Sequence, residues 1–412
     1  MLGCRFFYVI SFLFLFVSGK SQQENYFSLS DTSNFVSTYV DASYNSNNLG
    51  NKFVNAFRNS EFLTDELKTA ASQKLNANNR FGGDLFVDIL AKINCDTLFK
   101  RPNLSLIFGL QDREHIDLKF SKNAFDLMFF GNKPFAGDTF DLGELSMNVY
   151  RYQKLKIGLL NENKEEGMVT GIAMNFIKGE MNQTIYSPTT TIYTEEFGRE
   201  VSVSSLSVYN GSDTTNNGFW ALNGVGVSFD LFGEFELRKR GKISFYVTDI
   251  GFINWNRNST TISIDSTTVY EGVEINNLFD IQSGFFFFFD SILNEVGASK
   301  RNRIYMSPTP IVFNSFFSDT INAKMKYTVG VYHQLFVNHI PKVYAQFFWS
   351  PIKEFTVVPQ ISYGGYGKFN SGLGLMLNTK SLNLVVGTRN LESLFSENTF
   401  GMSVFGGLGY RF

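Results

Sequence analysis

Apolar and polar residues alternate with a period of two along most of the chain from about Phe81 onward. In one clear example, Val225, Val227, Phe229 and Leu231 are interleaved with glycine, serine and aspartate. Similar alternation recurs in residues 104–110, 116–120, 145–149, 155–159, 243–247, 327–335, 343–349, 373–377 and 382–386. A period of two predicts β-strands with one apolar and one polar face.

Two architectures are compatible with this alternation. A membrane β-barrel directs its apolar residues to lipid and its polar residues to the lumen. A soluble β-sandwich directs the apolar residues to a core and the polar residues to water. The alternation favours the barrel only modestly.

The last strand, FGMSVFGGLGYRF, adds to the case for the barrel. Its apolar face consists of Phe400, Met402, Val404, Leu408, Tyr410 and Phe412. The segment resembles the terminal strand of bacterial outer-membrane barrels, which ends in an aromatic residue and serves as an assembly signal. The resemblance assigns that role to Gly409, Tyr410 and Phe412, although Gly407 stands where a polar residue is usual.

Counting back from Phe412 predicts short turns at one end of the barrel and longer loops at the other. Residues 379–381 and 351–353 are expected to be tight inner turns, and residues 389–399 and 362–370 to be outer loops. This asymmetry is typical of outer-membrane barrels. The short connection at 338–341 departs from it. We predict an all-β fold, an antiparallel transmembrane β-barrel of roughly 14 strands, with 12 to 16 allowed.

The N-terminus predicts export. Arg5 precedes the apolar run Phe6–Val17, and the small residues Ser18, Gly19 and Ser21 follow. This is the pattern of a secretory signal peptide, too short for a transmembrane helix. We assign residues 1–21 to the signal peptide, cleaved after Gly19 or Ser21, and residues 22–412 to one barrel domain.

Three segments depart from the strand pattern. Residues 61–75 have a helical apolar face, with Ser60 as a candidate N-cap. A second short helix is expected at Lys122–Phe130, capped by Ser121 and ended by Gly131. These helices are expected to plug the lumen, to lie on the periplasmic rim, or to be small packing elements. Residues 276–301, with five consecutive phenylalanines, are expected to form a long loop or part of a strand.

Composition limits the partners and the chemistry. A net charge of −2, from 36 basic and 38 acidic residues, argues against a nucleic-acid partner. The 46 phenylalanines fit either the aromatic girdles of a barrel or an AT-rich genome. Only Cys4 and Cys95 occur, and Cys4 lies in the leader, so no internal disulfide and no cysteine metal cluster are expected.

The histidines do not suggest a catalytic or metal site. His115 is expected in a turn beside Arg113 and Glu114, while His333 and His339 are expected to flank a strand end near a membrane interface. No carboxylate or cysteine lies at metal-ligand spacing from them. His333 is a weak pointer to a lipid-facing catalytic histidine, and no G-x-S-x-G motif is present. We expect no enzyme activity, no catalytic, cofactor-binding or metal-binding residue, and no cofactor.

Several stretches resemble an outer-membrane barrel family of Bacteroidota catalogued as a domain of unknown function. They are residues 131–160 (GNKPFAGDTFDLGELSMNVYRYQKLKIGLL), 223–237, 243–256, 270–280 and the C-terminal 28 residues. The Asn-Pro-Ala-type motif near the start of many members is missing around Asp31–Tyr44. The family has no assigned activity. In general appearance it resembles fatty-acid-transporter-type barrels and barrels associated with type IX secretion, a likeness of architecture that does not fix function.

These observations lead to an expected function. We expect a non-enzymatic protein of the outer membrane, a structural or interaction subunit of a cell-surface or secretion-associated complex. The alternative is an outer-membrane transporter or channel for small or hydrophobic solutes. The expected partners are outer-membrane lipid, the barrel-assembly machinery acting on the C-terminal strand, and other proteins of such a complex.

Overall fold

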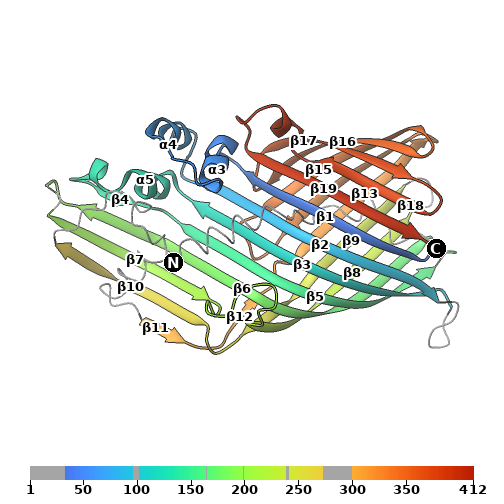
Figure 1. The fold of residues 1–412 in the computed structure, drawn as a ribbon, viewed down its shortest axis with the longest axis horizontal. Helices are drawn as coiled ribbons and strands as arrows, with labels where there is room; N and C mark the ends of the chain where they lie inside the picture. Colours follow the sequence, from blue (N-terminus) through green and yellow to red (C-terminus); the bar gives the residue numbers. More distant parts are fainter. Residues whose placement is uncertain (1–32, 96–101, 164, 198, 238–240, 272–298) are drawn as a thin grey trace.

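In the computed structural model, fourteen antiparallel strands form a closed β-barrel (Figure 1). The structure describes residues 33–95, 102–163, 165–197, 199–237, 241–271 and 299–412. In order, the wall contains β1 (Phe35–Ser46), β2 (Asn79–Cys95), β3 (Leu104–Phe120), β5 (Leu145–Asn163), β6 (Met168–Thr194), β8 (Gly224–Glu236), β9 (Lys242–Trp255), β13 (Val312–Asn322), β14 (Met325–Gln334), β15 (Ile340–Ile352), β16 (Phe355–Gly365), β17 (Phe369–Asn378), β18 (Leu382–Thr388) and β19 (Gly401–Arg411). Pairing of β19 with β1 closes the barrel, so the predicted fold and strand number are confirmed.

The remaining elements lie in the connections. These strands and helices are β4 (Thr139–Asp141), β7 (Glu200–Gly211), β10 (Thr260–Glu271), β11 (Ser299–Asn302), β12 (Tyr305–Pro308), α3 (Asn51–Arg58), α4 (Asp65–Ser72), α5 (Lys122–Phe130), η1 (Lys133–Phe135) and η2 (Leu391–Leu394). The three α-helices lie at the end of the barrel opposite the C-terminus (Figure 1).

A sheet extension projects from one side of the barrel. It is built on β6, whose 27 residues make it the longest strand described. The first half of β6 pairs with β8 in the wall, and its second half pairs with β7, which in turn pairs with β10. We call β7, β10, β11 and the second half of β6 the sheet extension (Figure 1).

Register shifts mark the places where β6 leaves the wall. One lies opposite Arg151 and Tyr152 of β5, and another lies between Tyr186 and Thr189. The second contains Pro188, which has no N–H to donate to a neighbouring strand and is therefore confined to edges and bulges. Bulges increase local twist and redirect a strand. They account for the passage of β6 from the wall into the sheet extension.

The outward face of the barrel is apolar on all fourteen wall strands. The strand register places these side chains in continuous rows. One row across six strands consists of Ile89, Leu110, Leu155, Phe176, Val227 and Phe252. The inward face buries charged residues such as Asp41, Asp230 and Lys92, none of them more than 1% exposed. Apolar outside and polar inside is the arrangement of a membrane barrel and the reverse of a soluble sandwich.

The observed helices agree only in part with those predicted from the sequence. Helix α5 begins and ends as predicted, with the Ser121 hydroxyl accepting a hydrogen bond from the N–H of Ala124 and Gly131 ending the helix. Helix α4, Asp65–Ser72, covers only the middle of the predicted segment 61–75. Ser60 is not its N-cap, because Ser60 has a φ of 58° and the Thr64 side chain caps the helix instead.

The position of the helices excludes one of the three expected placements, the rim near the chain end. Helix α3 was not predicted, and Phe53 on α3 packs against Phe125 and Phe129 of α5. The helices lie at the rim opposite Phe412, not at the rim near the chain end (Figure 1). The predicted signal peptide lies outside the described residues. So does most of the predicted 276–301 loop, of which only its last residues, in β11, are described.

Candidate functional site: the lumen and mouth of the barrel

Two short connections turn inward and bridge the barrel at the end opposite Phe412, which we call the mouth. At the end of β14, the Gln334 amide donates a hydrogen bond of 3.0 Å to Asp84 on β2. Strand β2 is second and β14 ninth in the ring of fourteen, so this bond joins diametrically opposite walls. In the β14–β15 connection, Asn338 donates to Asp117 of β3. Tyr366, between β16 and β17, lies 3.2 Å from His115. The lumen is therefore crossed by direct contacts at this level.

His115 is central to these contacts, and its predicted position in a turn is wrong. It lies within β3, its side chain faces the lumen, and it is 2% exposed. Its Nδ1 is 3.0 Å from Asp84, and its Nε2 is 3.1 Å from Asp117. The polar run around His115 suggests a turn, but a barrel strand can be polar on its lumen face and also on its outer face where it leaves the apolar band.

Charged side chains from several strands form a buried network next to His115. Arg113 contacts Asp84 at 3.0 Å and Asp249 on β9 at 3.4 Å. Lys154 also pairs with Asp249, and these side chains are at most 12% exposed. Removing one partner of a buried ion pair leaves an uncompensated charge and costs about 3–5 kcal/mol. The network therefore holds β2, β3, β5 and β9 together across the lumen.

Toward the other end, the lumen is filled by aromatic residues. Phe232, Tyr246 and Phe316 belong to one buried cluster with side chains from strands between β1 and β15. The rings of Tyr246 and Phe316 stack at 6.0 Å, and the Tyr246 hydroxyl donates to Glu234 at 2.5 Å. A second cluster includes Tyr39, Phe86 and Phe405. Side chains of the wall thus pack against one another inside the barrel, as in a protein core.

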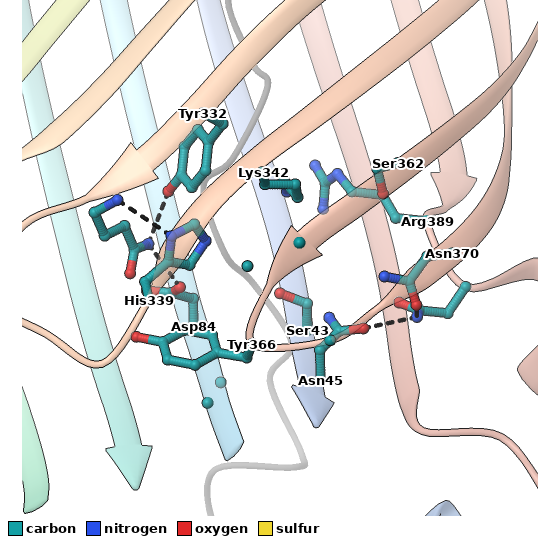
Figure 2. Close-up of a pocket in the computed structure, with 17 residues that line it drawn as sticks. Ser43, Asn45, Asp84, Tyr332, His339, Lys342, Ser362, Tyr366, Asn370 and Arg389 are labelled. Atoms are coloured by element: carbon teal, nitrogen blue, oxygen red, sulfur yellow. Dashed lines mark hydrogen bonds between the residues drawn. The ribbon is translucent and has the colours of Figure 1, made fainter. Parts of the chain in front are cut away.

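A small cavity of about 50 Å³ remains at the mouth (Figure 2). Most of the lining side chains are polar: Ser43, Asn45, Asp84, Tyr332, Gln334, His339, Lys342, Ser362, Tyr366, Asn370, Arg389 and Asn390. They come from β1 and β2 on one side and from β14–β18 on the other. Lys342 and Arg389 are the lysine and the arginine among the lining residues (Figure 2).

Two groups in the connections at the mouth have shifted pKa values. Burial, together with the positive charge of Lys342 and the neighbouring His333, holds the pKa of His339 well below its usual value. Burial raises the pKa of Tyr366 well above its usual value, with a further contribution from the nearby Asp117 and Asp84. His339 is therefore neutral and Tyr366 is protonated at neutral pH.

A glycine makes room for the Tyr366 side chain. A Cβ added at Gly82 would lie 2.4 Å from the Tyr366 ring. Only glycine therefore allows this ring to lie directly on β2. No local pattern indicates this contact, because Gly82 and Tyr366 are far apart in the chain and each resembles an ordinary strand or turn residue.

The residues predicted from the sequence do not meet at one site. In β19, Gly409 faces inward and Tyr410 faces outward, at the end of the barrel far from the mouth cavity. Tyr410 stacks on Phe412 at 6.3 Å. His333 and His339 flank the end of β14 as predicted, with their Nδ1 atoms 3.4 Å apart. Only His339 lines the cavity.

Neither a metal-ligand cluster nor a membrane-spanning helix occurs among the described residues. No group of three or more His, Cys, Asp or Glu side chains in the described ranges could hold a metal ion. None of the helices in those ranges is long and apolar enough to span a membrane.

The apolar belt, the charged lumen and the closed ring define a β-barrel of the outer-membrane type. Residues 20–388 match the model of a family described as "Family of unknown function (DUF5723)", and the chain belongs to this family. The resemblance inferred from the sequence is thereby confirmed. No curated protein matches the chain.

Solved structures with a similar chain path have very different sequences. The toluene transporter TodX of Pseudomonas putida matches with 7% identity and a TM-score of 0.44, covering 95% of this chain and 93% of that one. A FadL homologue of Pseudomonas aeruginosa matches with 8% identity and a TM-score of 0.42, covering 92% and 91%. The translocator domain of the autotransporter NalP from Neisseria meningitidis matches with 9% identity and a TM-score of 0.34, covering 95% and 92%.

Proposed function

We propose that this protein is a non-enzymatic outer-membrane β-barrel with a closed lumen, acting as a structural or interaction subunit of a cell-surface or secretion-associated complex. The observation that carries the proposal is the hydrogen bond between Gln334 and Asp84 across the barrel. A wall that bonds to its own opposite side is held as a rigid body. Such a barrel serves as an anchor for other surfaces rather than as a pore.

The sheet extension supplies the surface for a partner. Leu206 and Val208 on β7 are 45% and 38% exposed, and Tyr186 on β6 is 52% exposed. Tyr186 pairs with Val208 in the strand register, so these side chains are neighbours. Exposed apolar side chains grouped on a protein surface are typical of interaction sites. We assign contact with a partner protein to this face.

Conductance distinguishes this function from that of a channel. The purified full-length protein is inserted into planar bilayers, and the expected result is no ion current. A triple variant, Asp84→Ala with Asn338→Ala and Tyr366→Ala, removes the contacts across the mouth. Combined with Tyr246→Ala and Phe316→Ala, which remove part of the aromatic packing toward the other end of the lumen, it is expected to conduct. Glu195→Ala, in an exposed pair with Arg199, is the matched control and should stay silent. Steady current through the unmodified protein would favour the transporter or channel instead.

Cross-linking tests the partner. A photoreactive amino acid at Leu206 is expected to capture a specific protein in intact cells. The same amino acid at Leu384, an outward residue in the apolar band of β18, serves as the control. The same cross-linked proteins at both positions, or no cross-linked protein at Leu206, would contradict an interaction role for the sheet extension.

A further inference from the structure

The mouth cavity contains a lysine that lacks an acidic partner. Lys342 lies on β15 with its Nζ 4.7 Å from the centre of the Tyr332 ring. In the described part of the chain, no carboxylate lies within ion-pair distance of this nitrogen. The nearest acids are already engaged, Asp41 by Arg389 and Asp84 by Arg113. A cation in a semi-enclosed site without a counter-charge attracts an anion from solution.

Two amides that line the same cavity as Lys342 have free donors. The Asn390 amide donates hydrogen bonds of 2.8 Å to the Oδ1 atoms of both Asn45 and Asn370. This sharing fixes the orientation of both acceptor amides. Among the described residues, the Nδ2 atoms of Asn45 and Asn370 have no hydrogen-bond acceptor of their own. Ser43 and Ser362 add hydroxyl groups to the same cavity (Figure 2).

The volume of the cavity limits the size of the ligand. A water molecule needs about 10–15 Å³ of cavity volume. The cavity of about 50 Å³ therefore holds roughly three to five water-sized groups. A phosphate has five heavy atoms and a carboxylate group with its methyl has four. A sugar ring or an acyl chain is larger than the space available.

We propose that the mouth cavity binds a small oxyanion, a carboxylate or phosphate group, between Lys342 and the donor side chains of Asn45 and Asn370. The ammonium group supplies the charge and the amides supply directed hydrogen bonds. Hydrogen bonds from a charged donor to an oxyanion are about twice as strong as neutral ones, so Lys342 carries most of the affinity. The site depends on the cavity and not on the role proposed for the sheet extension.

Titration calorimetry on the full-length protein in neutral detergent tests the site. The probes are inorganic phosphate and acetate as free anions, and phosphatidic acid in mixed micelles as a lipid-borne phosphate. Binding of phosphate or acetate by the unmodified protein is expected, and Lys342→Met should weaken it by about tenfold or more. Binding of phosphatidic acid alone, lost in the same variant, would support the oxyanion site and assign its source to lipid.

Matched variants separate loss of the site from loss of the fold. Lys326→Met is the control, because Lys326 is also a cation over an aromatic ring, Phe348 at 5.4 Å, but does not line the cavity. It should bind as the unmodified protein does. If Lys342→Met fails to fold, Ser43→Leu fills the cavity and keeps the charge, and should also abolish binding. No binding of any probe, or equal affinity of the unmodified, Lys342→Met and Ser43→Leu proteins, would overturn the proposal.

Discussion

The hydrogen bond across the barrel is accessible to a double-mutant cycle between Asp84 and Gln334. Asp84 accepts from Arg113, His115 and Gln334, each at 3.0 Å. Asp84→Ala removes all of these contacts and leaves buried cations with less compensation, which is expected to cost about 3–5 kcal/mol of unfolding free energy. Gln334→Ala removes one hydrogen bond to a charged acceptor, expected to cost about 1.5–3 kcal/mol.

The double variant is expected to be less destabilised than the sum of the two single variants. A coupling of at least about 1 kcal/mol is expected, because residues in direct contact typically show 0.5–3 kcal/mol. Equilibrium urea unfolding in lipid vesicles, followed by the fluorescence of the 3 tryptophans, measures all four proteins. Arg199→Ala, which breaks an exposed ion pair, should change stability by no more than about 0.5 kcal/mol. Costs that add within about 0.5 kcal/mol would refute a direct bond across the lumen.

Three further changes test other parts of the barrel. Leu375→Arg places a charge in the outward apolar belt of β17 and should cost about 2–4 kcal/mol in vesicles, whereas an unchanged midpoint would argue against lipid contact. Deletion of Phe412 should lower the amount of barrel assembled in cells, measured by heat-dependent gel migration, with normal assembly ruling out the proposed signal. Gly82→Ala should displace the Tyr366 ring and increase protease cleavage at the β16–β17 connection, and an unchanged digestion pattern would contradict this contact.

Features governed by local sequence were predictable. A period of two follows directly from a wall with unlike faces, so it indicated the fold, the approximate strand number and many outward residues, although none of the alternating stretches marked β6 or β13. Helix α5 was predicted to the residue because Ser121 and Gly131 are local signals at its two ends. Helix α4 was only partly predicted, because the candidate cap Ser60 competed with Thr64 four residues later. Nothing in the sequence of α3 marks its start, and Gly50 before it makes no side-chain cap.

Features that depend on distant contacts were not predictable. The polar segment around His115 has the composition of a turn, and only its partners on β2 and β16–β17 make it a buried strand. At the mouth cavity, Asn390 contacts Asn370, 20 residues away in the chain, and Asn45, 345 residues away. No single stretch contains a motif for such a site. The sheet extension was not predicted either, because it depends on the change of pairing partner along β6, from β8 to β7.

The length of β6 has a consequence for the reach of the protein above a bilayer. At about 3.3 Å per residue, its 27 residues extend for roughly 90 Å, about three times the thickness of a hydrocarbon core. Even at a tilt of about 45°, the strand would rise roughly 60 Å along the membrane normal. Because β6 passes from wall to projection without interruption, a load applied to the distal tip would be transmitted through one continuous backbone to the embedded barrel.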